Sequence, residues 1–311
     1  MTKYIKRQLR KAKRQMTDNN KPTLSIVILN YNTKDLLIQC LKSLIEVKLE
    51  LDFEIIVVDN GSIDNSVKAV QDLDDGKSPV IKIVKNDQNL GFAKGNNAAR
   101  QYCEGQYVLF LNSDTIVNPG VLSESIEFMK LDQKIGVLTV KQVMLNGNID
   151  PDSRRSFPTP WVSLTHFSKL DRLFPHTAIL SKYWYSHIDP NLVIDIDVSQ
   201  GAFFLNRKKV LDQVDWFSED YFLDGEDIDL SWKIKGLGYR IVYYPKVWIY
   251  HLKKQTKKLS TRYVSSGVDS MEIFYRKHMW SNYPFFVNWL VILGIRFIKF
   301  LRSIKVLFLN K

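Results

Sequence analysis

The sequence predicts an α/β protein built on a doubly wound, mostly parallel sheet. Apolar segments of strand length alternate with amphipathic segments of helix length through the first third of the chain. The strand segments are almost continuously apolar, which is typical of parallel strands covered on both faces. Ligands of such sheets bind beyond the carboxyl ends of the strands. The residues that follow each strand are therefore the first candidates for a site.

The predicted strands are rich in β-branched and aromatic residues, and turn residues bound them. They are residues 24–30, 53–60, 80–85 and 107–114. The helices between them repeat apolar residues every three or four positions. They are residues 33–46, 63–73 and 91–103. Right-handed crossovers are expected to join the strands. The last strand, YVLFLNSD, is expected to act as a rigid support that aims Asp114 at the sheet edge.

Polar residues follow three of these strands, as Asn30-Tyr31-Asn32, residues 59–62 (DNGS) and residues 112–114 (NSD). Turn preference alone would explain any one of them, but their recurrence at one edge favours a binding site. The chain has no GxGxxG after the first strand and no GxxxxGK[ST]. Nucleotide phosphates are therefore not held in the usual glycine-rich way. A hard cation on oxygen ligands such as Asp114 would neutralise them instead.

A second group of chemistry-bearing residues lies between residues 220 and 229, which contain five acids. A helix is predicted over residues 228–239 and a strand over residues 240–250. Acids at a helix start stabilise it by ~0.3–1 kcal/mol each through the macrodipole, which would account for two of them. Their density favours a general base that acts on a hydroxyl group. They are Asp220, Asp224, Glu226, Asp227 and Asp229.

The net charge of +11 lies mainly at the two ends of the chain. Residues 1–21 hold eight Lys and Arg and one Asp, and residues 285–311 hold five Lys and Arg and no acid. A nucleic-acid-binding protein would carry its basic surface on the folded core, so no nucleic-acid partner is expected. The only cysteines, Cys40 and Cys103, are expected in the core. Without a disulfide framework, a reducing compartment is expected.

Both ends show helical patterning. Residues 1–21 carry one narrow apolar stripe, which predicts either a basic helix on a membrane surface or a solvated leader, and not a signal peptide. Residues 285–295 are apolar but shorter than the ~20 residues that a membrane span needs. The basic residues that follow at a spacing of three are Arg296, Lys299, Arg302 and Lys305. This predicts a helix in the bilayer interface whose basic side chains reach anionic head groups. The alternatives are a helix packed on the protein and, third, a true span.

Six segments together resemble family 2 glycosyltransferases of the GT-A fold, and within them the bacterial rhamnosyltransferase-like group. They are SIVILNYN, EIIVVDNGSIDNS, NDQNLGFAKGNNAA, VLFLNSD, SQGAFFLNRKKVL and FLDGEDIDLSWKIKGLGY, in the family's order. The resemblance implies a GT-A domain over residues 22–255, with a nucleotide-binding half and an acceptor half. Residues 1–21 would be a basic leader and residues 256–311 a helical membrane-interface segment.

The resemblance also implies roles for individual residues. The residues implied at the donor are Asn30, Asn32, Asp59, Gly91, Asn96, Asn112, Asp114, Gly201 and Ala202. Asp114 and His251 would be the metal ligands, and Glu226-Asp227 stands at the ED motif with Asp227 as the catalytic base. Asn112 departs from the family's DxD motif and brings no charge. Mg²⁺ or Mn²⁺ on Asp114 and the diphosphate is still expected, with weaker affinity.

The expected reaction is an inverting displacement, in which Asp227 takes the proton of the acceptor hydroxyl. The resemblance favours dTDP-L-rhamnose as donor, with a UDP-hexose or galactofuranose donor as the alternative. The acceptor would be a glycan or a lipid-diphosphate-linked glycan of the cell envelope, at the cytoplasmic face of the cell membrane. Residues 150–175 are expected over the acceptor side. A nucleotidyltransferase and a non-catalytic membrane-surface scaffold are the rival functions.

Overall fold

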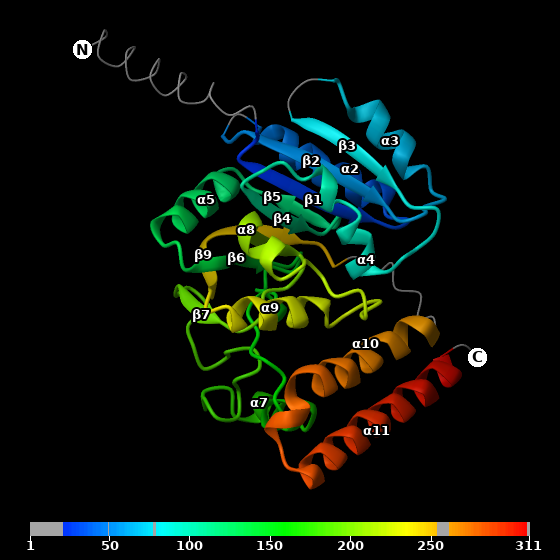
Figure 1. Ribbon diagram of the computed structural model, residues 1–311, viewed down its shortest axis with the longest axis vertical. Coiled ribbons are helices and arrows are strands. Elements are labelled where there is room, and N and C mark those ends of the chain that lie inside the picture. Colours follow the sequence, from blue (N-terminus) through cyan, green and yellow to red (C-terminus); the bar gives the residue numbers. More distant parts are fainter. Residues whose placement is uncertain (1–20, 49, 77–78, 254–260, 310–311) are drawn as a thin grey trace.

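The computed structural model describes residues 21–48, 50–76, 79–253 and 261–309 (Figure 1). Its strands form one nine-stranded sheet in the order β3-β2-β1-β4-β8-β6-β9-β5, with β7 paired to β9. The strands are β1 Leu24–Asn30, β2 Phe53–Asp59, β3 Val80–Lys85, β4 Tyr107–Leu111, β5 Thr115–Val117, β6 Ile135–Val143, β7 Ile194–Ile196, β8 Phe203–Arg207 and β9 Arg240–His251. Strands β1 to β4 pair in parallel, as predicted, whereas β8 runs antiparallel to both β4 and β6.

Helices cover both faces of this sheet. The helices are α2 Lys34–Glu46, α3 Ser66–Leu73, α4 Phe92–Asn97, α5 Val121–Leu131, α6 Pro160–Phe167, α7 Leu170–Leu173, α8 Lys208–Gln213, α9 Glu226–Gly236, α10 Thr261–Phe274 and α11 Phe285–Leu309. Apolar side chains of α2, α3 and α5 pack on one face, and those of α4, α8 and α9 pack on the other. The predicted doubly wound α/β fold is therefore confirmed.

The turn after β4 differs from the prediction. The strand ends at Leu111, so Asp114 lies in the turn that leads into β5. Strand β5 crosses to the far part of the sheet and pairs with β9, where Thr115 is opposite His251. The backbone N–H of Leu252 also donates to the carbonyl of Asp114 at 2.8 Å. Strand pairing, and not the end of β4, therefore brings Asp114 to His251.

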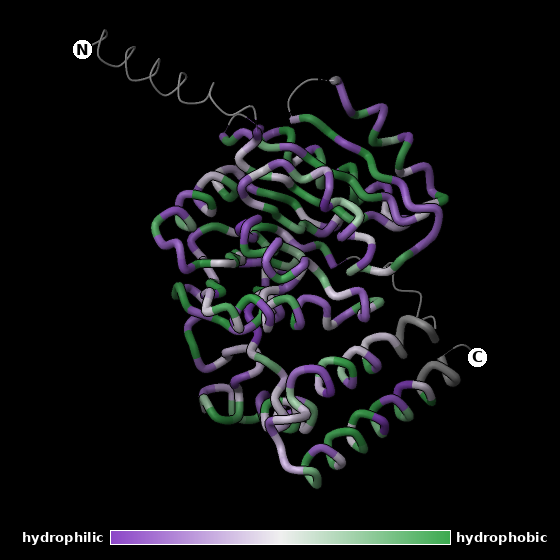
Figure 2. Tube along the Cα trace, in the orientation of Figure 1, coloured by the Kyte–Doolittle hydropathy of each residue, from purple (hydrophilic) through white to green (hydrophobic). Residues whose placement is uncertain are grey.

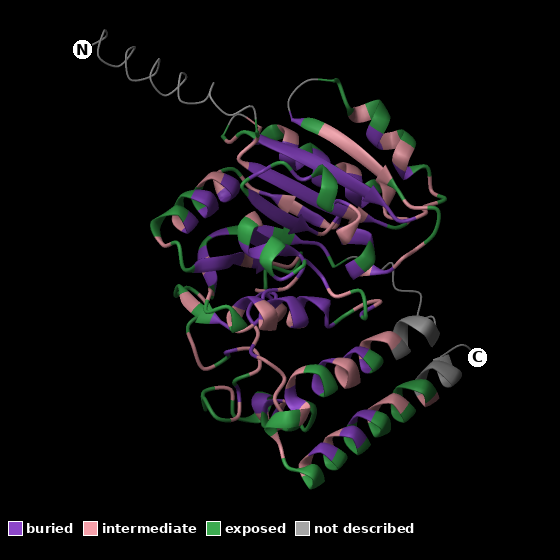
Figure 3. Ribbon diagram, viewed as in Figure 1, coloured by how far each residue is buried: buried purple, intermediate pink, exposed green. Residues whose placement is uncertain are grey.

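The helices α10 and α11 lie side by side outside the sheet layers (Figure 1), and with residues 275–284 they form what we call the C-terminal hairpin. Ile292 and Ile295 of α11 are buried against Phe274 and Met279. The opposite face of α11 exposes large apolar side chains (Figures 2 and 3). They are Phe285, Phe286, Trp289, Leu290, Leu293, Phe297, Phe300 and Leu301. One face thus packs on the protein, as the alternative interpretation had it, and the other face has no protein cover among the described residues.

The basic residues of α11 differ from the prediction as well. The Lys299 ammonium lies 2.5 Å from the Asp269 carboxylate of α10, and Arg296 lies 3.9 Å from Glu272. Both side chains therefore have acidic neighbours within the hairpin. The apolar stripe predicted in residues 1–20 lies outside the described residues. No helix in the described part of the chain has the length and apolarity needed to cross a membrane.

The C-terminal hairpin is attached to α9 through the buried carboxylate of Asp229. Its Oδ1 lies 2.7 Å from His278 Nε2, 3.2 Å from Lys277 Nζ and 3.2 Å from the Tyr221 hydroxyl. Burial alone would raise the pKa of Asp229, but the hydrogen bond to His278 and the charges of Lys277 and Lys233 outweigh burial and lower that pKa. The ionised form of Asp229 therefore stabilises the packing of the hairpin on α9.

We expect Asp229→Asn to lower the free energy of unfolding by on the order of 2 kcal/mol at pH 7, because Lys277, Lys233 and His278 lose the buried carboxylate that they share. A lowered folded-state pKa stabilises the fold above the ordinary value of 3.8, and this stabilisation is lost as the pH falls through the folded-state pKa. The difference between the two proteins should therefore shrink in acid. Chemical denaturation at pH 7 and pH 3 measures both values.

The matched control is Asp269→Asn, which removes an exposed ion pair of the same hairpin. It should change the free energy of unfolding by less than about 1 kcal/mol. Equal effects of the two substitutions would contradict the role assigned to Asp229.

Candidate active site

The first predicted site residues meet where β1 and β2 end. Asn30 pairs with Asp59 in the strand register, and its Nδ2 donates to Asp59 Oδ1 at 3.0 Å and to the Ser62 hydroxyl at 3.0 Å. The Thr33 hydroxyl donates to Asn30 Oδ1 at 2.6 Å. Asn32 closes the same group, because its Oδ1 accepts from the backbone N–H of Ile63 at 2.8 Å. These polar groups hold the two turns together at one corner of the sheet edge.

A neighbouring loop, residues 86–91, depends on Asn60, which sequence analysis did not single out. The buried Asn60 side chain donates to Asn89 Oδ1 at 3.0 Å and to the carbonyl of Gly91 at 3.1 Å. Its Oδ1 accepts from Asn86 Nδ2 at 3.0 Å and from the backbone N–H of Leu90 at 3.1 Å. Four bonds from one amide fix the course of this loop. Sequence analysis placed residues 59–62 (DNGS) at the polar sheet edge, but nothing in the pattern indicated that Asn60 would hold the neighbouring loop.

Gly91 allows this loop to approach the segment that precedes α9. Its φ is +86°, and a Cβ there would lie 2.4 Å from the carbonyl oxygen of Phe222. The backbone N–H of Phe92 donates to that same carbonyl at 2.7 Å. Asn96, in contrast, is buried and donates to the carbonyl of Phe92 at 2.9 Å. This hydrogen bond of Asn96 therefore lies within α4.

The loop Gly201-Ala202 lies beside the turn after β4. The backbone N–H of Asn112 donates to the carbonyl of Ala202 at 3.4 Å, and a Cβ on Gly201 would lie 2.9 Å from the ring of Phe92. The Ser113 hydroxyl is 2.9 Å from the Thr33 hydroxyl. The turns after β1, β2 and β4 and the loops at residues 91 and 201 thus form one continuous edge, as the sequence predicted.

Asp114 and His251 meet in a second group of charges. His251 Nε2 lies 3.4 Å from Asp114 Oδ1, and His251 Nδ1 lies 2.9 Å from Asp150 Oδ2. The fully buried Asp150 also binds Lys253 Nζ at 2.8 Å. Burial alone would lower the pKa of His251, but its hydrogen bonds to Asp114 and Asp150 outweigh burial and raise that pKa to about 9. Asp150 therefore fixes the orientation of the imidazole ring, and sequence analysis missed it.

The side chains that meet here would suit a divalent cation that is coordinated partly by the protein and partly by a bound diphosphate. Asp114 and His251 supply one oxygen and one nitrogen that face each other, and Asp150 orients the imidazole as carboxylates do for metal-bound histidines. No group of three or more His, Cys, Asp and Glu side chains that could hold a metal ion occurs among the described residues. The chain thus offers two ligands here, and further ligands would come from a bound diphosphate or from water.

The third group contains Asp227 and Glu226 at the start of α9. Asp227 Oδ2 forms a short ion pair with the guanidinium of Arg155, and Asp227 Oδ1 accepts from the backbone N–H of Ile228 at 2.8 Å. Burial, reinforced by the charges of Asp227 and Asp224, raises the pKa of Glu226 well above its ordinary value. A carboxyl group with a raised pKa and a carboxyl group paired with an arginine therefore stand side by side, and environments that differ in this way separate acid and base roles.

One short segment joins the second and third groups. Asp150 binds His251, and Arg155 binds Asp227. The sequence prediction placed residues 150–175 over the acceptor side. The described contacts add that the first residues of this segment reach the charged groups themselves. Nothing in the local sequence pattern signalled that the side chains of Asp150 and Arg155 would be largely buried.

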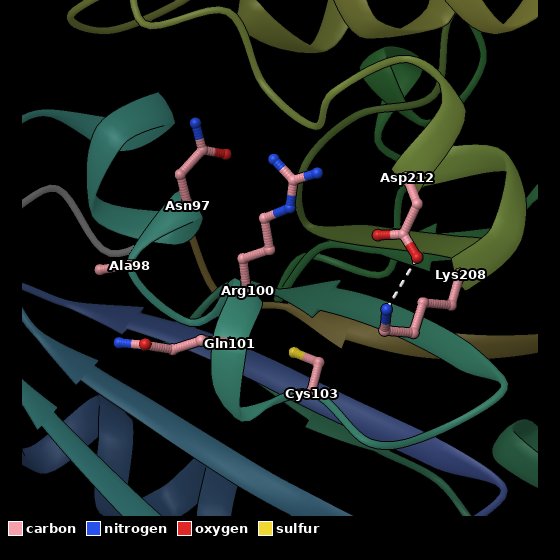
Figure 4. A pocket seen from close by; sticks show the side chains of 7 residues that line it. All are labelled: Asn97, Ala98, Arg100, Gln101, Cys103, Lys208 and Asp212. Carbon is pink, nitrogen blue, oxygen red and sulfur yellow. Dashed lines mark hydrogen bonds and ion pairs between the residues drawn. The ribbon is translucent and has the colours of Figure 1, made fainter.

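A cavity of about 520 Å³ lies away from these three groups (Figure 4). It adjoins the start of β4 and the end of β8, at the opposite end of β4 from Asn112. Burial raises the pKa of Cys103 in its wall to about 12, so this thiol stays protonated. The cavity is lined by Asn97, Ala98, Arg100, Gln101, Cys103, Lys208 and Asp212. The cavity therefore lies at the opposite end of the β4 strand from the candidate site, and it is not part of that site.

The family model for glycosyl transferase family 2 matches residues 25–215. Similar curated proteins include the poly-beta-1,6-N-acetyl-D-glucosamine synthases of Staphylococcus aureus, 24% identical over 256 residues, and Staphylococcus epidermidis, 25% identical over 233 residues. The alignments cover 81% and 75% of this chain but 56% and 50% of those proteins. The chain thus spans about half the length of the curated relatives it matches.

Solved structures of similar fold include two glycosyltransferase complexes. The mannosyltransferase PcManGT of Pyrobaculum calidifontis, solved with GDP-Man and Mn²⁺, has a TM-score of 0.56 at 17% identity, covering 86% of this chain and 69% of that chain. S. aureus TarS 1-349, solved with UDP-GlcNAc, has a TM-score of 0.53 at 24% identity, covering 81% of this chain and 65% of that chain. At these identities the likeness supports the GT-A type fold and nothing finer.

Proposed function

The chain belongs to glycosyl transferase family 2, and we propose that it moves a sugar from a nucleoside-diphosphate sugar to a hydroxyl of a glycan or lipid-linked acceptor, inverting the anomeric carbon. The observation that carries this proposal is the approach of Asp114 to His251 at 3.4 Å, on the sheet edge where the turns after β1 and β2 also lie. That edge combines polar groups for a nucleotide with a position for a cation. Polysaccharide synthesis is the setting that the relatives' names support.

On the donor side, we propose that Asn30, Asn32 and Asp59 border the nucleoside, with Gly91 and Asn96 shaping the adjoining loop. Asn112, Gly201 and Ala202 would surround the sugar and its first phosphate. Asp114 and His251 would hold Mg²⁺ or Mn²⁺, which takes up charge on the leaving diphosphate. Asn112 would contribute a hydrogen bond and no charge, so that less of the metal's affinity comes from the protein.

On the acceptor side, we propose that Asp227 removes the proton of the attacking hydroxyl. Asp227 is paired with the guanidinium of Arg155, whereas burial and the charges of Asp227 and Asp224 raise the pKa of its neighbour Glu226. A single displacement needs no protein nucleophile, and burial raises the pKa values of both Cys40 and Cys103 to about 12. In such a displacement the nucleoside diphosphate would leave from the face of the sugar opposite the attacking hydroxyl, and Asp114 and His251 would hold the cation that neutralises it.

The proposal also names a donor sugar. The rhamnosyltransferase-like resemblance favoured dTDP-L-rhamnose, and a UDP-hexose or galactofuranose donor was the alternative. The curated relatives are named N-acetylglucosamine polymer synthases, and one structural neighbour holds UDP-GlcNAc. These names favour UDP-GlcNAc over the rhamnose donor. A donor panel that includes dTDP-L-rhamnose, UDP-GlcNAc and UDP-galactofuranose, with nucleotide release read by mass spectrometry, tests the choice.

We further propose that the exposed face of α11 lies on the cytoplasmic face of the cell membrane, where a lipid-linked acceptor would be presented. The exposed residues include Trp289, whose indole suits the interface, and Phe285, Leu290 and Leu293. Arg302 is exposed on the same helix, and residues 1–21 add basic charge that anionic lipids attract. An apolar helix face with basic residues nearby is typical of a helix that lies on a bilayer surface.

Asp227→Asn should lower kcat by ~10²–10⁴-fold, because the amide keeps the shape of the side chain but cannot accept the proton. Donor binding should change little. Steady-state kinetics with the donor found in the panel, together with donor titration, measures the two effects. Asp195→Asn, which alters only an exposed ion pair with Arg240, is the control. A kcat within a few-fold of wild type would exclude Asp227 as the base.

Asp114→Asn should weaken binding of the nucleoside diphosphate at least ~10-fold in the presence of Mn²⁺ and remove the difference between Mn²⁺ and chelator. The charge-restoring change Asn112→Asp should act in the opposite direction and strengthen metal-dependent binding. Calorimetric titration with and without Mn²⁺ measures both. Wild-type activity that survives exhaustive chelation unchanged would refute the metal site.

Leu290→Asp combined with Leu293→Asp should lower binding to anionic vesicles at least ~10-fold, since each leucine, 66% exposed in the protein, would otherwise be buried in lipid. Substitution of these two exposed leucines suits this test better than deletion of α11, which would uncover the buried Phe274 and Tyr275. Vesicle sedimentation with anionic and neutral lipids measures the effect, and high salt should reduce the anionic preference.

The control pairs Leu131→Asp with Leu145→Asp, two leucines that are 81% and 64% exposed elsewhere on the surface. It should bind vesicles like wild type. Unchanged vesicle binding by the α11 variant, together with a loss of dimer mass in solution, would show that this face binds a second copy of the chain instead.

A further inference from the structure

Arg155 is a nearly buried cation that neither the donor side nor the metal position uses. Its side chain is 12% exposed and its Nη2 is paired with Asp227 Oδ2. The second oxygen of Asp227 is held by the backbone N–H of Ile228. Both oxygens of the carboxylate therefore have fixed donors, which hold its plane in one orientation. Each oxygen keeps a further lone pair for another partner.

The backbone of Arg155 is fixed as firmly as its side chain. Its N–H donates to the carbonyl of Val198 at 3.2 Å, and its own carbonyl accepts from the N–H groups of Val198 at 2.9 Å and Asp197 at 3.2 Å. This bridge joins Arg155 to the segment that runs into Gly201. The backbone that carries the guanidinium is therefore held in place by these hydrogen bonds to residues 197 and 198.

The charges around this pair explain why a cation is needed. Glu226, next to Asp227 at the start of α9, interacts with the charges of both Asp227 and Asp224. Tyr183 and Asp152 interact with Arg155. Arg155 is the cation in direct contact with Asp227 among the described residues. Burial alone would lower the pKa of Arg155, but the charge of Asp227 raises it above its ordinary value. Without this guanidinium, the nearly buried carboxylate of Asp227 would stand beside the buried Glu226 with no cation in contact.

We propose that Arg155 is a positioning residue for the transfer reaction: it orients the Asp227 carboxyl group and keeps a positive charge against it, so that the remaining lone pair can accept the acceptor's proton. This inference rests on the proposed role of Asp227 as the base. It adds that the base does not work alone, and that a cation from the segment after β6 is part of the same unit.

The experiment compares Arg155→Gln, Arg155→Lys, Asp227→Asn and the double variant Arg155→Gln/Asp227→Asn with wild type. Arg155→Gln should lower kcat by ~10²-fold and leave the donor KM unchanged. The acidic limb of its pH–rate profile should move to higher pH, because a carboxylate without its cation takes up a proton more readily. Arg155→Lys should recover part of kcat and keep the wild-type limb. The double variant should be no slower than Asp227→Asn, since residues that act as one unit are not additive.

The matched control is Arg154→Gln. Arg154 is also buried, but it donates to the carbonyl of Ile188 at 3.0 Å and lies over the ring of Tyr243. It should leave the pH–rate profile where it is in wild type. Thermal melts establish that each variant is folded. If Arg155→Gln does not fold, a kcat of Arg155→Lys equal to that of wild type overturns the proposal, and a lowered kcat at unchanged KM supports it.

A raised donor KM with unchanged kcat in Arg155→Gln would overturn the inference, because Arg155 would then bind donor. Additive losses in the double variant would overturn it too. If Asp227→Asn is inactive while Arg155→Gln is normal, this inference fails and the proposed base stands. If Asp227→Asn is itself normal, the proposed role of Asp227 fails first.

Discussion

The arrangement of the site depends on one short buried segment, Asp150 to Arg155. At one end Asp150 holds His251 and Lys253, and at the other end Arg155 holds Asp227. Both contacts pair a buried charge with its opposite, so neither partner can leave without exposing the other to an apolar surrounding. This segment therefore connects the candidate cation position, which the pairing of β5 with β9 builds, to the candidate base at the start of α9.

Much of the fold was predictable because it follows from local periodicity. The bounds of β1 and β3 agree with the predicted strands, and β4 ends three residues earlier than predicted. The polar sheet edge was predictable too, since parallel strands bring their carboxyl ends together. Asp150 and Arg155 were not, because their partners lie 101 and 72 residues away. No periodic pattern reports a charge pair that forms over such a separation.

The C-terminal hairpin shows where a local pattern stops being informative. Amphipathic spacing predicted α11 but not which of its faces meets the protein. A signal was present in Asn288, the one polar residue within FFVNWLV. In the structure it is buried, with bonds to the Tyr275 hydroxyl at 2.6 Å and to the carbonyl of Trp280 at 3.0 Å. A polar side chain inside an apolar run marks a face with a specific protein partner, whereas lipid would leave its amide unsatisfied.

The pairing of β5 with β9 has a consequence for how the protein is made. The nucleotide-side turns after β1 and β2 can form early, since their contacts span about thirty residues. The contact between Asp114 and His251, however, cannot form until β9, the last strand of the sheet in the sequence, has been synthesised and has paired with β5. Long-range strand pairing is also the slow part of folding. A nascent chain thus acquires a nucleotide-facing edge well before it acquires a complete set of charged groups. A chain whose synthesis stops before β9 therefore lacks the contact between Asp114 and His251.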